Sequence, residues 1–260
     1  MITFKNPAQF KKMEVAGRCV AKAHEAVRSA AGPGVTTLQL DRIAEKVIRG
    51  ERCAPSFLGY RGYPASICAS PNDVVVHGIP DTRRLREGDL LSIDIGAVYQ
   101  GFHGDAACTF AIGEVSPEAS ALSAAAEEAL WEGLGKARPG KRIGDIGAAV
   151  EAVARREGYG VVEGYVGHGI GRAMHEKPDV PNLGVAGRGV RLRKGMALCI
   201  EPMFNLGTAA TRVDRDAWTV RTADGSISAH WEHTVCLTPD GPLVTTTPVA
   251  INLLEATAGR

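Results

Sequence analysis

The chain has 260 residues, enough for one large domain or two small ones with ample core. Hydrophobic residues make up 45% of it and charged residues 23%, and the formal net charge is +1. This balance is ordinary for a globular protein and excludes a strongly basic nucleic-acid surface or an acidic tail. No apolar run approaches the length of a membrane span, and the start lacks the apolar segment of a signal peptide. Six cysteines without a C-x-x-C pair predict reduced thiols in a cytoplasmic protein.

The first part of the chain predicts two helices. Asn6 can cap a helix that begins at Pro7. Its apolar residues Phe10, Met13, Val20 and Val27 share one helical face, and residues 32–34 (G-P-G) end it. A second helix begins near Thr37, with Leu40, Ile43 and Val47 as its buried stripe. Strands are predicted at 73–77, 90–95 and 107–110.

The same order of elements returns in the second part. Ser116 and Pro117 open a helix that carries Leu122, Leu130 and Leu134, and residues 139–140 break it. A shorter helix contains Ile146, Val150 and Val153, and strands follow at 196–200 and 231–237. This order predicts an internal duplication, although coincidence between two generic helix pairs is the alternative. We expect a single α+β domain over 1–260, made of two fused halves at roughly 1–112 and 113–260, with a shared site between them.

One histidine and four carboxylates stand out because each lies in a short β-like or turn segment. A set rich in oxygen with a single imidazole is typical of sites for divalent Mn, Fe, Co or Zn. Four carboxylates carry more negative charge than one divalent ion needs, which favours two adjacent ions and a hydrolytic site. The five residues are Asp94, Asp105, His168, Glu201 and Glu232.

Asp94 and Asp105 flank a predicted hairpin turn at 98–101. If the turn centres between Tyr99 and Gln100, the two aspartates lie directly opposite each other, with Cβ atoms about 4.5–5.5 Å apart. Two bare carboxylates there would repel, and a cation between them would convert repulsion into binding. Two surface aspartates are the alternative, but Asp94 lies among Leu91, Ile93 and Ile95.

The other three residues have similar settings. His168 lies in G-H-G-I-G, where the glycines permit close backbone approach, and the tract lacks the spacing of a dinucleotide-binding turn. Glu201 ends the apolar run 196–200, and Glu232 lies within a β-like segment. A structural salt bridge is the alternative for each, but no Lys or Arg lies close by in either strand. No G-x-S-x-G or H-E-x-x-H motif offers a competing catalytic set.

Eleven short motifs resemble the type I methionine aminopeptidases in their bacterial short form, over about residues 6–239. They are 14–17 (E-V-A-G), 59–64 (G-Y-R-G-Y-P), 77–80 (H-G-I-P), 88–89, 93–94, 101–105 (G-F-H-G-D), 167–171, 175–176, 195–196, 200–202 (I-E-P) and 232–234 (E-H-T). The resemblance implies the pita-bread fold with internal pseudo-two-fold symmetry. It implies removal of the N-terminal methionine from nascent proteins and peptides when the second residue is small, through a hydroxide that bridges two metal ions.

The resemblance also implies roles for individual residues. Asp105 and Glu232 would bridge two divalent ions (Co, Mn, Fe or Zn), Asp94 would bind one ion, and His168 with Glu201 the other. Glu201 would move a proton, and His77 and His175 would contact the substrate. The methionine pocket would consist of Phe57, Tyr60, Tyr63, Cys68, Met174 and Trp218. A monovalent cation would be held by backbone oxygens of Asn72, Val74 and Ser228.

Three residues depart from the common pattern of the bacterial enzymes, namely Phe57, Arg61 and Met174, and all concern the pocket and its rim. Expected partners are nascent polypeptide N-termini and peptides beginning with Met, with no nucleic acid or membrane, and the protein is expected to be a monomer. The proline-specific relatives, prolidase and aminopeptidase P, usually have a large N-terminal domain, and Asp94 comes too early for one. Type II methionine aminopeptidases have an insertion between the counterparts of His175 and Glu201 that this chain lacks. A non-enzymatic binding module of the same fold would tend to lose metal ligands, and all five are present.

Overall fold

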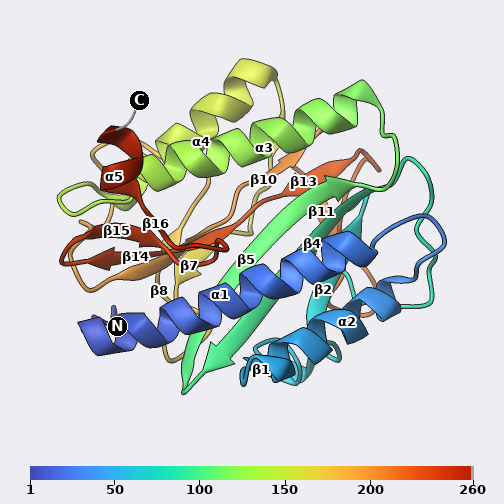
Figure 1. The fold of residues 1–260 in the computed structure, drawn as a ribbon. Coiled ribbons are helices and arrows are strands. Elements are labelled where there is room, and N and C mark those ends of the chain that lie inside the picture. The colour runs from blue at the N-terminus through green and yellow to red at the C-terminus, as the bar shows by residue number, and fades with distance from the viewer. Residues whose placement is uncertain (259–260) are drawn as a thin grey trace.

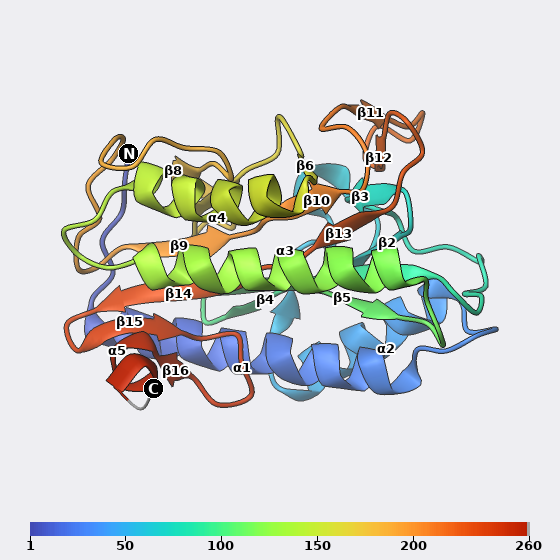
Figure 2. The ribbon, with the colours of Figure 1, turned by 90° about the horizontal axis from the view of Figure 1, so that it is seen from above.

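The computed structural model describes residues 1–258, and two helix pairs frame its sheets. Figure 1 shows one helix pair above the strands and the other below them. Seen from above in Figure 2, α3 and α4 run side by side across the strands. The helices are α1 (Pro7–Ala30), α2 (Thr37–Gly50), η1 (Tyr60–Gly62), α3 (Pro117–Lys136), α4 (Ile143–Glu157) and α5 (Leu253–Ala258). Within the described residues, no helix is long and apolar enough to cross a membrane.

The strands form four antiparallel sheets. The first joins β1 (Ala54–Pro55), β2 (Ile67–Pro71), β4 (Leu90–Tyr99) and β5 (Phe102–Ala111). Two small sheets consist of β6 (Gly160–Val161), β10 (Met203–Asn205) and β13 (Ser228–His230), and of β3 (Val74–Val76), β11 (Thr211–Val213) and β12 (Val220–Thr222). The fourth joins β7 (Gly167–Gly169), β8 (Glu176–Val180), β9 (Ala197–Ile200), β14 (His233–Thr238), β15 (Gly241–Val244) and β16 (Ile251–Asn252).

Local sequence accounts for the helix boundaries. The Asn6 side chain accepts a hydrogen bond from the Gln9 backbone N–H at 3.0 Å, and the Gln9 side chain accepts one from the Asn6 N–H at 2.9 Å. This reciprocal capping box satisfies two N–H groups that the first turn leaves without partners. The predicted start at Pro7 is confirmed, and the apolar face of α1 is buried as predicted.

The buried stripe of α2 differs from the prediction. Leu40, Ala44 and Ile48 are fully buried, whereas Ile43 and Val47 are only partly buried beside the same core. The reason is the spacing: positions four apart (40, 44, 48) form the narrow line that contacts the sheet, and the bulkier residues lie on its flanks. Ala44 was missed because its small side chain contributes little to an apolar pattern.

The β4–β5 hairpin forms as predicted, but its register was wrong. Tyr99 pairs with Phe102, so Asp105 lies opposite Gly96 and Asp94 lies opposite Ala107. Gln100 and Gly101 have φ of 47° and 75°, and two positive values at the turn match the twist of the strands. The offset is two residues, so Asp94 and Asp105 remain on one face as diagonal rather than directly opposed neighbours.

The predicted strand at 231–237 is interrupted. One strand ends at His230 and the next begins at His233, which leaves Glu232 between them. The Glu232 backbone instead exchanges two hydrogen bonds with Ala107 of β5, at 2.8 and 3.3 Å. This bridge joins the second half of the chain to the hairpin of the first half.

The core confirms the repeated order of elements. In the first half, α1 and α2 pack against the hairpin sheet around Leu40, Ile93 and Ile95. In the second half, α3 and α4 pack against the long sheet and β10 through Leu130, Val150 and neighbouring residues. The α+β class is confirmed, and the five candidate ligands lie on or directly beside the strands between the helix pairs.

Candidate metal centre and active site

One cavity collects the predicted site residues. All five candidate metal ligands, both candidate histidines and all six predicted pocket residues line it, together with Arg61 and Val76. Asp94 comes from β4, Asp105 from β5 and His168 from β7. Glu201 follows the end of β9, and Glu232 lies between β13 and β14. Strands from both halves therefore contribute to one site.

Three carboxylates of this cavity each have a buried oxygen without a hydrogen-bond partner in the described residues. Within residues 1–258, buried oxygens of Asp94 (Oδ1), Asp105 (Oδ1) and Glu232 (Oε1) accept no hydrogen bond from the protein. Burial raises the pKa of Asp94 to about 7, and burial with repulsion from neighbouring carboxylates raises the pKa of Asp105, Glu201 and Glu232 well above their usual range. Buried carboxylates this close are stable as anions only beside a counter-charge, so the donor set fits divalent cations.

His168 is prepared to act as a ligand. Its Nδ1 donates to the Gly169 carbonyl oxygen at 2.9 Å, which leaves the lone pair on Nε2. That Nε2 lies 4.0 Å from Asp105 Oδ2 and 3.6 Å from Glu201 Oε1. Burial, the largest cause, lowers the pKa of His168 to about 3, so the imidazole is neutral at physiological pH.

Sequence reasoning did not place Cys199 near this centre. Potential ligand atoms of Asp105, His168, Cys199 and Glu232 lie within 4.8 Å of one another. The Cys199 thiol, however, lies 3.5 Å from the Thr234 hydroxyl in an apolar cluster and does not line the cavity. We therefore treat it as packing behind the carboxylates, and Asp94 and Glu201 as the groups that complete the set.

Two further histidines, His77 and His175, line the cavity. The Nδ1 of His175 lies 2.9 Å from the Tyr60 hydroxyl, and the two rings stack with centroids 5.3 Å apart. His77 has φ of 60°, a strained value for a residue other than glycine, and its ring contacts Tyr165 and Trp218. Burial lowers the pKa of His77 and His175 to about 4, so both are neutral at pH 7. Tyr165 was not predicted, because nothing in its local sequence marks it.

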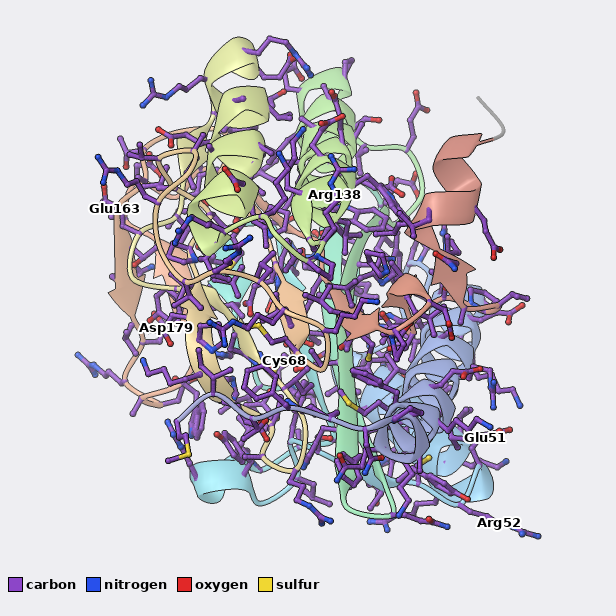
Figure 3. All side chains as sticks on the ribbon, turned by 90° about the vertical axis from the view of Figure 1, so that its left-hand side faces the viewer. Glu51, Arg52, Cys68, Arg138, Glu163 and Asp179 are labelled. Carbon is purple, nitrogen blue, oxygen red and sulfur yellow. The ribbon has the colours of Figure 1, made fainter. Side chains whose placement is uncertain are left out.

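An apolar pocket adjoins the acidic cluster. Phe57, Tyr63, Ala65, Cys68 and Met174 form its buried wall, with Tyr60, Ile79 and Trp218 packed against them. Figure 3 shows Cys68 in the interior of the molecule. The ring of Phe57 occupies the space over Gly96, where a Cβ atom would lie 2.7 Å from the Phe57 ring. Phe57 and Gly96 are therefore a matched pair in this chain.

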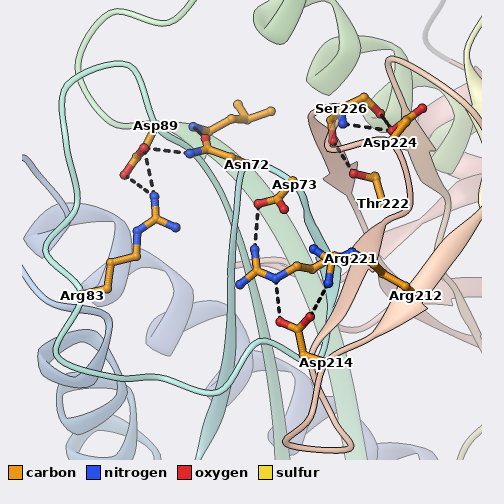
Figure 4. A network of polar contacts seen from close by, with 11 residues as sticks. Asn72, Asp73, Arg83, Asp89, Arg212, Asp214, Arg221, Thr222, Asp224 and Ser226 are labelled. Carbon is orange, nitrogen blue, oxygen red and sulfur yellow. Dashed lines mark hydrogen bonds and ion pairs between the residues drawn. The ribbon is translucent and has the colours of Figure 1, made fainter.

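An ionic network holds the segments that carry His77 and Trp218. Arg221 of β12 contacts Asp73 at 2.8 Å and Asp214 at 2.6 Å, and so links the β11–β12 hairpin to the turn before β3 (Figure 4). Asn72 donates to Asp89 at 2.8 Å, and Arg83 contacts the same carboxylate. None of these ion pairs was predicted, because their partners are distant in sequence.

The residues of the predicted monovalent cation site lie close together. The Asn72 backbone oxygen accepts a hydrogen bond from the Ser228 N–H at 2.8 Å, and Val74 begins the adjoining β3. His230, also unpredicted, ends β13 with its Nε2 3.9 Å from Glu201 Oε2 and with no hydrogen-bond partner in the described residues. The predicted cation site and His230 both lie near the segments that carry the acidic cluster.

Comparison with known proteins assigns the class. Residues 11–239 match the model of metallopeptidase family M24, which spans most of the chain. The chain belongs to this metallopeptidase family. The prolidase of Pyrococcus furiosus shares the fold, with a TM-score of 0.75 at 20% identity, but this chain covers only 65% of it.

Within the family, the chain is similar to methionine aminopeptidases. It is 52% identical over 249 residues to methionine aminopeptidase 1 of Mycobacterium tuberculosis, covering 93% of this chain and 94% of the relative. The crystal structure of the Thermotoga maritima methionine aminopeptidase superimposes with a TM-score of 0.93 at 41% identity, covering 95% of this chain and 100% of that one. The fold is accordingly the pita-bread fold expected from the sequence.

Proposed function

We propose that this protein is a metal-dependent aminopeptidase that removes the N-terminal methionine from polypeptides. The observation that carries the proposal is the shared cavity: a cluster of unpartnered carboxylates with one neutral histidine adjoins an apolar pocket. The similarity to methionine aminopeptidases over nearly the full length of the chain supports the same activity. Nascent polypeptide N-termini and peptides that begin with Met are its proposed partners, in the cytoplasm.

The metal site would use all five candidate ligands. Asp105 and Glu232, the most deeply buried carboxylates, would bridge two divalent ions, Asp94 would complete one coordination sphere, and His168 with Glu201 the other. Bound divalent ions polarise a carbonyl group and lower the pKa of water, which is the chemistry that peptide hydrolysis requires. The oxygen-rich set accepts Mn, Fe, Co or Zn.

Glu201 and His175 would handle protons and charge. Glu201 borders the acidic cluster and is partly exposed to the cavity, so its carboxylate can carry a proton to the leaving amine. Nδ1 of the neutral His175 imidazole lies 2.9 Å from the Tyr60 hydroxyl, and in the proposed mechanism this hydroxyl would donate to Nδ1, which would place the ring proton on Nε2. That N–H can donate to the scissile carbonyl oxygen as negative charge develops there. His77, held against Trp218, would orient the peptide backbone.

The apolar pocket would bind the methionine side chain. Its sulfur and aromatic groups, Cys68, Met174, Tyr63 and Trp218, match a flexible thioether. Because His77 and His175 line the same cavity as this pocket, the second residue of the substrate would have to be small. We also propose that residues 1–260 act as one catalytic domain of two fused halves and as a monomer, with a monovalent cation at Asn72, Val74 and Ser228.

Peptide hydrolysis by metal-stripped protein tests the proposal. We expect no methionine release from Met-Ala-Ser without metal and full activity after addition of a divalent ion. Met-Ala-Ser should be cleaved and Met-Phe-Ser should not, because the second residue must be small. Cleavage of Xaa-Pro dipeptides in place of Met-Ala-Ser would instead support a prolidase, and activity that persists in chelator would refute the metal mechanism.

A further inference from the structure

Arg61 places an exposed positive charge at the mouth of an acidic cavity. It lies in η1 and lines the same cavity as the carboxylate cluster. Its φ is 49°, and the nearby glycines Gly59 and Gly62 have φ of 82° and 88°. A left-handed conformation is unfavourable for arginine and is often retained where a residue has a function.

The guanidinium group has no acidic partner in the described part of the chain. Within residues 1–258, no carboxylate lies within ion-pair distance of Arg61, whereas Arg18, Arg156 and Arg221 each form an ion pair. The group lies over the Tyr60 ring, 5.3 Å from its centroid. Tyr60 in turn stacks on His175. Contacts through Tyr60 therefore connect the Arg61 guanidinium group to the candidate catalytic histidine.

The shape of the cavity defines what can reach Arg61. Among the lining residues, Arg61 and His175 are exposed and Tyr60 is partly exposed, so they border the opening of the cavity. With methionine in the apolar pocket and its amine at the carboxylates, the third residue of a bound peptide would pass Arg61. A carboxylate side chain at the third substrate position could form paired hydrogen bonds with the planar Arg61 guanidinium group, whereas a lysine there would be repelled.

We infer that Arg61 is a specificity-determining residue that favours an acidic side chain at the third position of the substrate. The inference rests on the proposed function, because it assumes that methionine occupies the apolar pocket. It adds a charge preference outside the pocket, at the border of the cavity.

A peptide series isolates the effect. We compare Met-Ala-Glu-Ser, Met-Ala-Gln-Ser and Met-Ala-Lys-Ser, all amidated so that no C-terminal carboxylate competes. Because exposed ion pairs contribute little, we expect kcat/KM to favour Glu over Gln by only about 1.4- to five-fold, mainly through KM. Lys should be poorer than Gln, and the preference should shrink in high salt.

Two substitutions of Arg61 and one matched control complete the design. R61Q should make the three peptides equivalent, and R61E should reverse their order. Arg52 is the control because it is also an exposed arginine with positive φ, 60°, but lies at the periphery of the molecule, away from the cavity (Figure 3). R52Q should retain the wild-type order.

The possible outcomes separate this inference from the proposed function. An unchanged order in R61Q, or the same change in R52Q, would overturn the role of Arg61 while leaving methionine release intact. Failure of the wild-type protein to release methionine from any of the three peptides would instead overturn the proposed function. Metal content and circular dichroism of R61Q should equal those of the wild type, which excludes misfolding as the cause.

Discussion

In the proposed function, a hydrogen bond donated by the Tyr60 hydroxyl to Nδ1 of His175 would hold the ring proton on Nε2. Without that donor, the two neutral tautomers of the imidazole become closer in energy, and the Nε2–H available to the substrate is less populated. A hydrogen bond of this kind contributes roughly 0.5–1.5 kcal/mol, so Y60F should lower kcat by about two- to ten-fold. Divalent metal content should not change, because Tyr60 is not among the candidate ligands. An unaltered kcat would show that Tyr60 does not position His175.

Asp105 is the candidate ligand whose loss should matter most. In D105N the fold is retained and one negative charge disappears from the buried cluster. Divalent metal binding, measured by calorimetry, should be weakened or lost together with peptidase activity. The metal-free variant should melt at a higher temperature than the metal-free wild type, because repulsion among the carboxylates is reduced. Tight binding of two ions by D105N would contradict the bridging role.

His24 provides a pH dependence away from the metal site. Burial lowers its pKa to about 4, against about 6.5 in an unfolded chain. The folded protein therefore binds fewer protons there, so this contribution to stability is complete above pH 6.5 and is lost as the pH falls toward 4. The shift corresponds to an upper limit of about 3 kcal/mol, since the side chain is partly exposed.

Urea unfolding at pH 7.5 and pH 5 tests this dependence. The wild type should lose more stability between the two pH values than H24Q, whose amide can still donate to the Ala106 carbonyl oxygen that His24 contacts at 2.8 Å. Equal losses in both proteins would show that His24 does not titrate in this range.

At the scale of elements, β4 must leave room for the pocket wall. A methyl group in G96A would meet the Phe57 ring at 2.7 Å and Ser56 Cβ at 2.9 Å. We expect Phe57 to move into the cavity and KM for Met-Ala-Ser to rise several-fold, with metal content retained. F57L/G96A should recover part of the loss, because a smaller side chain relieves one of the two contacts. Strictly additive effects of the two substitutions would refute the pairing.

The elements also show what sequence patterns can predict. Helix starts followed from local capping residues, as at Asn6 and Ser116, and were correct. The hairpin register was predicted wrongly. The turn consists of Gln100 and Gly101, both in the left-handed region, whereas the sequence pattern placed its centre one residue too early. The two-residue offset preserved the face of each side chain, so the prediction that Asp94 and Asp105 share a site survived the error.

For the whole molecule, the repeated order of helices and strands predicted that two halves enclose one site. The structure places ligand candidates from β4 and β5 beside those from β7, β9 and the β13–β14 break. Contacts between residues that are distant in sequence left no local pattern to predict them. Examples are the ion pairs of Arg221 and the contact between the rings of Tyr165 and His77. The proposed methionine pocket was predicted from family resemblance alone, since its residues are scattered from Phe57 to Trp218.

The central claim is that this cavity binds two divalent ions through five residues from both halves. Anomalous X-ray diffraction from crystals of the metal-stripped protein soaked in Mn²⁺ tests it most directly. We expect two peaks, both in contact with Asp105 and Glu232, one also with Asp94 and the other with His168 and Glu201. Peaks confined to the protein surface, or an ion bound by Cys199 in place of Asp94 and Glu201, would contradict it.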